Sequence, residues 1–89
     1  MAINLFKYRS EVVVASILGS KQENISINQV STWLEISEEL TRSHLYKMAL
    51  KGILSKSIEK PIVFSLSQEF LKDSKIYGIE NTIHAYSLR

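Results

Sequence analysis

The stretch WLEISEELTRSHLYKM, residues 33–48, carries the clearest structural signal in the sequence. Ser37 stands directly before Glu38 and Glu39, which is typical of a helix start, because a serine side chain caps free backbone N–H groups and carboxylates favour the positive end of the helix dipole. Apolar side chains then recur every three or four residues, as one buried helix face requires. A shorter helix precedes Ile36, so the stretch predicts two helices joined by a tight turn.

Hydrophobic patterns on the N-terminal side predict further elements. Residues 10–19, SEVVVASILG, fit a helix, although the three consecutive valines would also suit a strand. Residues 3–9 either extend this helix or form a separate arm. The stretch Ile25–Ile27 predicts a few residues of strand, and Asn28 is placed to cap the helix that leads into the turn. The two helices of the central stretch are expected to bury Val30, Leu34, Thr41, Leu45 and Met48.

The pattern changes from helical to alternating after Gly52. This glycine follows the last lysine of the helix, where a residue with positive φ commonly ends a helix. Apolar and polar residues then alternate over residues 53–58 and 62–66, which predicts a β-hairpin with Pro61 near its tip. Ser67 should cap a last helix. The fold class expected from these elements is mainly α with a small β-hairpin (α+β).

Composition narrows the functional classes. The 89 residues allow a single domain, 1–89, and contain no cysteine, which excludes a disulfide scaffold, a cysteine nucleophile and a thiolate zinc site. No apolar run is long enough to span a membrane and no leader pattern occurs, so we expect a cytoplasmic protein. His44 and His84 lie far apart, and no phosphate-binding loop or catalytic signature accompanies them. We therefore expect no enzymatic activity, no metal and no cofactor.

Positive charge is concentrated in one short segment. The whole chain has a net charge of +2, but residues 41–60 contain five basic residues against Glu59 alone, a balance of +4. A local basic segment is what contacts with nucleic-acid phosphates require. The five basic residues are Arg42, Lys47, Lys51, Lys56 and Lys60.

Residues 25–54, ISINQVSTWLEISEELTRSHLYKMALKGIL, resemble the core of bacterial and archaeal winged-helix transcription regulators of the MarR, ArsR and PadR kind. FSLS at residues 64–67 is similar to the Y-x-L-T with which the wing of those proteins ends. The resemblance implies a winged helix-turn-helix domain, with the helix-turn-helix at about 29–51 and the wing at about 53–66. Glu35 stands where the family often has glycine, so we expect a turn geometry that keeps this glutamate away from positive φ.

The resemblance also implies a function, sequence-specific binding to double-stranded DNA by a small transcriptional regulator. In that family the outward face of the second helix enters the major groove. The alternative is a winged-helix protein-interaction module within a larger nucleic-acid-handling assembly, in which the basic residues form only a solvated surface. No pattern in the sequence identifies a small-molecule effector. We expect base contacts from Arg42, Ser43 and Tyr46, and phosphate contacts from Lys47, Lys51, Lys56 and Lys60.

Two residues at the start of the second helix also belong to the expected DNA surface, Ser37 and Glu38. For Glu38 there are two interpretations. It stabilises the helix start and pairs with Arg42 four residues later, or it accepts a hydrogen bond from cytosine N4 in the major groove. We favour the first interpretation, because the helix dipole stabilises a carboxylate at this position whether or not DNA is bound.

The C-terminal segment, about residues 68–86, predicts a homodimer. If the segment forms one helix, Phe70 and Tyr77 lie on one side and an apolar stripe lies on the other, which two copies would bury about a two-fold axis. If Gly78 ends the helix, the last residues instead fold back over their own domain. The N-terminal stretch INLFKYR, residues 3–9, is the alternative source of the interface, alone or together with the C-terminal segment. The stripe expected at the dimer interface consists of Ile76, Ile79, Ile83 and Tyr86.

Overall fold

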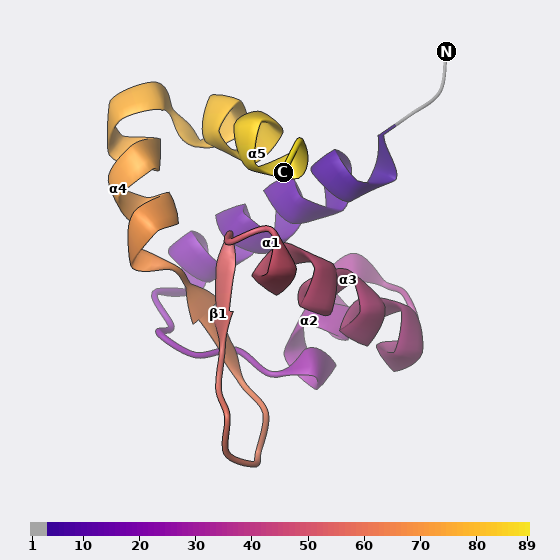
Figure 1. Ribbon diagram of the computed structural model, residues 1–89. Helices are drawn as coiled ribbons and strands as arrows, with labels where there is room; N and C mark the ends of the chain where they lie inside the picture. Colours follow the sequence, from indigo (N-terminus) through magenta and orange to yellow (C-terminus); the bar gives the residue numbers. More distant parts are fainter. Residues whose placement is uncertain (1–3) are drawn as a thin grey trace.

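The computed structural model describes residues 4–89, which form five helices and one two-stranded antiparallel sheet (Figure 1). The predicted class, mainly α with a small β-hairpin, is confirmed. No helix in the described part of the chain is long and apolar enough to cross a membrane. In chain order the elements are α1 (Leu5–Ser20), α2 (Ile27–Leu34), α3 (Glu38–Leu50), β1 (Leu54–Lys56), β2 (Phe64–Leu66), α4 (Gln68–Tyr77) and α5 (Ile79–Ser87).

The first helix, α1, begins at Leu5 because the side chain of Asn4 caps it. Asn4 Oδ1 accepts a hydrogen bond from the backbone N–H of Lys7 at 3.1 Å. The segment before residue 10 therefore extends the helix, and Ile3 lies outside the described residues. The three consecutive valines are helical, and two of them are fully buried. Burial in the core thus overrides their preference for strands.

The second helix, α2, is capped by Ser26. The Ser26 hydroxyl accepts from the backbone N–H of Gln29 at 3.2 Å, and the Gln29 side chain accepts from the backbone N–H of Ser26 at 3.0 Å. This reciprocal pair satisfies two N–H groups at once. The prediction that Asn28 caps the helix is therefore wrong. The predicted strand at Ile25 is also wrong, since this residue forms only one isolated bridge, to Phe64.

The turn between α2 and α3 contains a left-handed glutamate. Glu35 has φ 56° and ψ 40°, so the expectation that this turn avoids positive φ is wrong. The backbone N–H groups of Glu35 and Ile36 both donate to the carbonyl of Ser31, which closes the end of α2. Ser37 then caps α3 as predicted, because its hydroxyl accepts from the backbone N–H of Leu40 at 3.2 Å.

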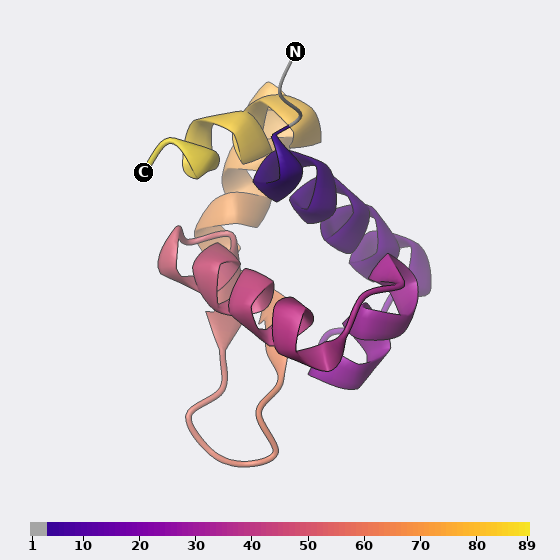
Figure 2. The ribbon, with the colours of Figure 1, turned by 90° about the vertical axis from the view of Figure 1, so that its right-hand side faces the viewer.

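A β-hairpin follows α3. Gly52 takes φ 91°, as predicted for the residue that ends the helix. Strands β1 and β2 pair with Leu54 opposite Leu66 and Lys56 opposite Phe64. Both views show the loop between the strands extending away from the helices (Figures 1 and 2). The inner ends of the strands are thus buried, and the loop is open to solvent.

The C-terminal segment is two helices and not one. Gly78, with φ 86°, separates α4 from α5, and the chain turns sharply there so that α5 packs against both α4 and α1 (Figure 1). Ile83 is 0% exposed and Tyr86 is 2% exposed, so both lie inside their own domain. The predicted dimer stripe is therefore wrong. Only Ile76 and Ile79 of its four members remain exposed, because the glycine turns α5 inward.

One hydrophobic core joins these elements. Helix α1 packs against α2 and α5, and α3 packs against α2 and β1 (Figure 2). The predicted inward face of α3 is confirmed, since Thr41, Leu45 and Met48 are fully buried. The hydrophobic side chains with no exposed surface are Val13, Val14, Val30, Leu45, Met48, Ile53, Phe64 and Ile83.

Candidate functional site

Four residues expected to contact DNA form the outward face of α3. The helix buries one side, so positions on the other side point to solvent. The structure brings the four together there and leaves all of them exposed. We call this surface the α3 outward face, and it consists of Arg42, Ser43, Tyr46 and Lys47.

The hairpin continues this surface. The ring of Tyr46 lies 5.9 Å from the ring of Phe64 in β2, and Lys56 Nζ lies 5.6 Å from the centre of the Tyr46 ring. Lys56 belongs to β1, so its ammonium group is held beside α3 and not at the far end of the hairpin. The α3 outward face and the inner part of the hairpin therefore form one surface. Lys60 is exposed further out, on the loop.

Lys51 does not belong to this surface, although it was expected to contact phosphate. Its Nζ donates to the backbone oxygens of Ser87 at 3.0 Å and Arg89 at 2.9 Å, and lies 5.6 Å from the centre of the Phe6 ring. These contacts use the ammonium group to join the end of α3 to the end of α5. The role of Lys51 in the structure is therefore to hold two helix ends together.

Glu38 has a partner that the sequence did not indicate. Its Oε1 accepts a hydrogen bond from Asn28 Nδ2 at 2.8 Å, which links the starts of α2 and α3. Within residues 4–89 the only ion pairs are Lys7 with Glu11 and Arg89 with Glu69. The predicted pair between Glu38 and Arg42 is therefore wrong, and the guanidinium of Arg42 has no carboxylate within 4.0 Å in this part of the chain.

His44 lies on the inner side of α3. It is 6% exposed, its Nε2 is 3.4 Å from Ser10 Oγ, and its ring contacts that of Phe6 at 5.1 Å between centres. Burial lowers its pKa from 6.5 to about 4, with further contributions from the positive charges of Arg9 and Lys47. At neutral pH the imidazole is uncharged and joins α1 to α3. It cannot reach a ligand on the α3 outward face.

An apolar depression lies beside the basic residues. Its volume is about 600 Å³ and Leu50, which is 89% exposed, is the largest apolar side chain that lines it. The sequence analysis did not single out Leu50, although the predicted buried face already places it on the outward side, four residues after Tyr46. The depression is lined by Ser43, Tyr46, Lys47, Ala49, Leu50 and Lys56.

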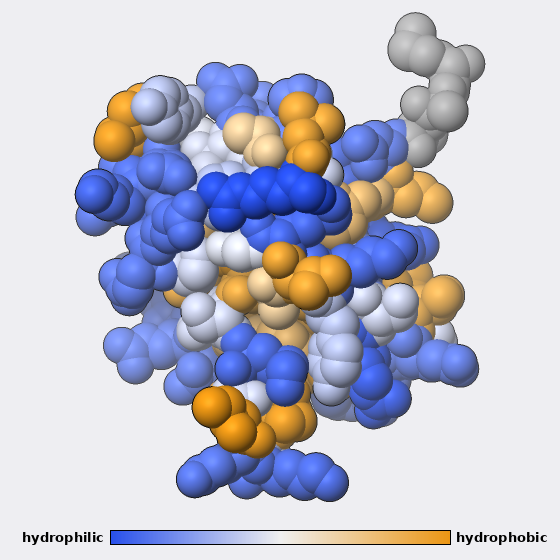
Figure 3. All heavy atoms as spheres, in the orientation of Figure 1, coloured by the Kyte–Doolittle hydropathy of each residue, from blue (hydrophilic) through white to orange (hydrophobic). Residues whose placement is uncertain are grey.

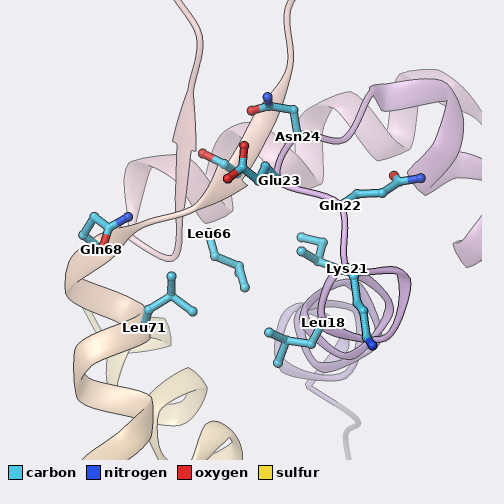
Figure 4. Close-up of a pocket in the computed structure, with 10 residues that line it drawn as sticks. Leu18, Lys21, Gln22, Glu23, Asn24, Leu66, Gln68 and Leu71 are labelled. Atoms are coloured by element: carbon cyan, nitrogen blue, oxygen red, sulfur yellow. The ribbon is translucent and has the colours of Figure 1, made fainter.

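A second pocket lies away from this surface, between the end of α1, β2 and the start of α4 (Figure 4). Its volume is about 400 Å³, and none of the residues expected to contact DNA lines it. No group of three or more histidine, aspartate or glutamate side chains able to hold a metal ion occurs in the described residues. The pocket has three leucines, Leu18, Leu66 and Leu71, and a polar rim formed by Lys21, Gln22, Glu23, Asn24 and Gln68.

Comparison of the chain with protein-family models, with curated proteins and with solved structures gave no match in any of the three. The functional argument therefore depends on the surface formed by the α3 outward face and the hairpin.

Proposed function

We propose that this chain is a winged helix-turn-helix protein that binds double-stranded DNA in a sequence-specific way, as a small cytoplasmic transcriptional regulator without catalytic activity. One observation carries the proposal. Cationic side chains without a carboxylate within 4.0 Å, in the described part of the chain, line α3 and the adjoining hairpin. DNA phosphates are the partner that such a surface fits best. These cations are Arg42, Lys47, Lys56 and Lys60.

The dimensions of α3 suit the major groove. The helix has 13 residues, which corresponds to a length of about 20 Å, and a groove about 12 Å wide admits a helix of this kind. In this arrangement Arg42, Ser43 and Tyr46 reach base edges, while Lys47 reaches phosphate. The α2–α3 pair corresponds to the helix-turn-helix, and the hairpin corresponds to the wing.

The carboxylates at the start of α3 are compatible with this function. Glu38 is hydrogen-bonded to Asn28 and so links the starts of the two helices. Glu39 is exposed in the first turn, where the helix dipole favours negative charge. The basic residues begin at Arg42, further along the helix. Phosphate attraction therefore acts along the rest of α3 and the hairpin, and the glutamates stabilise the helix start.

The apolar depression favours a second candidate function, a protein-interaction module within a larger nucleic-acid-handling assembly. Leu50 is almost fully exposed, and exposed apolar side chains in a concave surface are typical of protein interfaces. On a protein partner Leu50 would be a central contact. On DNA it would contribute little, because the surrounding lysines and Arg42 would supply the attraction.

A salt titration separates the two functions. We expect binding of wild-type protein to a mixed-sequence duplex to weaken with salt, with log K falling by about 0.9 per log unit of salt for each phosphate neutralised. The double variant K47A/K56A, which removes two of the proposed phosphate contacts, should lower this slope by about 2. The matched control is K72A/K75A, which removes two exposed charges from α4 and should leave the slope unchanged.

A second experiment distinguishes base contacts from phosphate contacts. After selection of preferred sequences from a random duplex pool, Arg42→Ala should reduce discrimination at one base position, at a cost of about 1–3 kcal/mol. Lys56→Ala should weaken all duplexes equally. Absence of salt-dependent DNA binding at low ionic strength would contradict the DNA proposal and favour the interaction module, for which Leu50→Ser should abolish partner binding.

A further inference from the structure

The hairpin loop presents an isolated apolar side chain to solvent. Ile58 is 94% exposed, more than any other large hydrophobic residue in the described part of the chain. It lies beyond the end of β1, and Figure 3 shows apolar atoms next to hydrophilic ones at the far end of the hairpin. A fully exposed isoleucine contributes nothing to the core. Its side chain is therefore free to contact a partner, and the loop that carries it and the charges around it indicate which kind of partner fits.

The loop that carries Ile58 has a defined conformation. The backbone N–H of Ser57 donates to the carbonyl of Val63 at 2.9 Å, and the backbone N–H of Val63 donates to Ser57 Oγ at 2.9 Å. The Ser57 hydroxyl also lies within hydrogen-bonding distance of the carbonyl oxygens of Glu59, at 3.2 Å, and Pro61, at 3.4 Å. These bonds close the loop across its base. Ile58 is thus held outward on an ordered loop.

Charges around Ile58 favour a polyanionic partner. Lys56 and Lys60 flank it in the chain, while Glu59 is the one carboxylate of the loop, so the loop and its base carry a net positive charge. Lys56 also lies beside Tyr46 on the α3 outward face. A duplex bound along α3 would therefore meet the loop at an adjacent position on the same DNA.

We propose that Ile58 inserts between neighbouring base pairs from the minor groove and bends the DNA, an inference that rests on the proposed DNA binding. Proteins that bend DNA from the minor groove use apolar side chains flanked by cations in this way, and the resulting bend is about 20–90°. An ordered loop suits this role, because a side chain held outward loses little conformational freedom on insertion. Insertion favours flexible pyrimidine–purine steps, so the hairpin contributes sequence preference without hydrogen bonds to bases.

The test uses two duplexes of about three helical turns, labelled at both ends for energy transfer. One contains a TA step in each turn and the other contains stiff A-tracts. With wild-type protein we expect increased energy transfer on the TA duplex and several-fold tighter binding to it than to the A-tract duplex. Ile58→Ser should remove both effects while keeping the salt slope, and Ile58→Met should retain them.

Two controls keep the result interpretable. Ile76→Ser changes an isoleucine that is 65% exposed on α4 and should behave as wild type. Thermal unfolding of Ile58→Ser should match wild type, because the side chain has almost no packing to lose. Salt-dependent binding with equal bending by wild type and Ile58→Ser would overturn the role of Ile58 and leave the proposed function intact. Absence of any salt-dependent DNA binding would overturn both, and would make Ile58 a contact for a protein partner.

Discussion

The phenol of Tyr86 donates a hydrogen bond of 2.7 Å to the carboxylate of Asp73 and so joins α5 to α4. The Tyr86 ring also meets Phe70 edge-on, with 5.4 Å between the ring centres. Burial raises the pKa of Tyr86 to about 12, and the hydrogen bond to Asp73 adds to this increase. The pair stabilises the sharp turn of the chain at Gly78, which keeps α5 against its own domain.

The first prediction concerns this pair. Tyr86→Phe should lower the free energy of unfolding by about 1–2 kcal/mol, because a hydrogen bond to a carboxylate is lost while the ring stays packed. Urea unfolding monitored by circular dichroism measures the change. Tyr77→Phe, at an exposed tyrosine of the same helix pair, is the control and should have no effect. Equal stability of Tyr86→Phe and wild type would show that the hydrogen bond contributes nothing.

A second prediction follows from the left-handed backbone of Glu35. A residue with a Cβ atom in this conformation costs about 1–2 kcal/mol, and glycine does not. We expect Glu35→Gly to raise the free energy of unfolding by about 0.5–1.5 kcal/mol, after allowing for the greater freedom of glycine in the unfolded chain. Glu35→Gln keeps the Cβ and removes the charge, so it should leave stability unchanged. A gain in Glu35→Gln as large as in Glu35→Gly would indicate charge, and not backbone strain, as the cause.

The burial of His44 predicts that the stability of the domain depends on pH. Its pKa is about 4 in the folded chain and 6.5 in the unfolded chain, so the unfolded chain binds a proton first as pH falls. The uncharged, buried His44 therefore makes its full contribution to the free energy of unfolding above pH 6.5. This contribution is lost between pH 6.5 and 4, to a total of up to about 3 kcal/mol. Unfolding by urea across this range should show a clearly shallower pH dependence in His44→Gln. His84→Gln, at an exposed histidine, should keep the wild-type dependence.

The hydrogen bond between Glu38 and Asn28 separates the two interpretations of that glutamate. We expect Glu38→Gln and Asn28→Ala each to lower stability by about 0.5 kcal/mol and to leave base preference unchanged, because the bond positions helices and does not contact bases. Unfolding experiments and selection from a random duplex pool measure the two effects. A changed base preference in Glu38→Gln, but not in Asn28→Ala, would instead assign Glu38 to cytosine recognition.

The buried position of Ile83 predicts how a charge there acts. Ile83→Asp should unfold the domain, since it places a carboxylate in the core, whereas Ile76→Asp should fold normally. Thermal unfolding measures both. The homodimer itself stays a prediction, tested by sedimentation of the wild-type chain. If Ile83→Asp folds and changes only the oligomeric state, Ile83 lies at a subunit interface and not in the core.

Local signals made much of the fold predictable. The caps at Ser37 and Ser67, the buried face of α3 and the positive φ of Gly52 each depend on a few neighbouring residues, and all agree with the structure. Gly78 was different. A glycine in a helical pattern is compatible with both a continuous helix and a reversal, and contacts with residues distant in sequence decide between them.

The candidate site was predictable to the same extent. Helical periodicity placed Arg42 and Lys47 on an exposed face, and the structure agrees. It could not show that Lys51 is held by the backbone of residues 87–89, because that contact joins the ends of α3 and α5. The bond from Asn28 to Glu38 depends in the same way on how α2 and α3 cross. Helical periodicity describes one helix at a time, so it does not predict hydrogen bonds between side chains on different elements.

The hydrogen bonds of Ser57 make the outer loop of the hairpin an exchangeable unit. Residues 58–62 are closed off by bonds to Ser57 and Val63, and the exposed residues 58–61 leave the core untouched. Substitutions in this loop can therefore change the contacts that the hairpin makes without changing the fold of the domain. If the chain binds DNA as proposed, substitution of a few loop residues changes its target preference at little cost in folding.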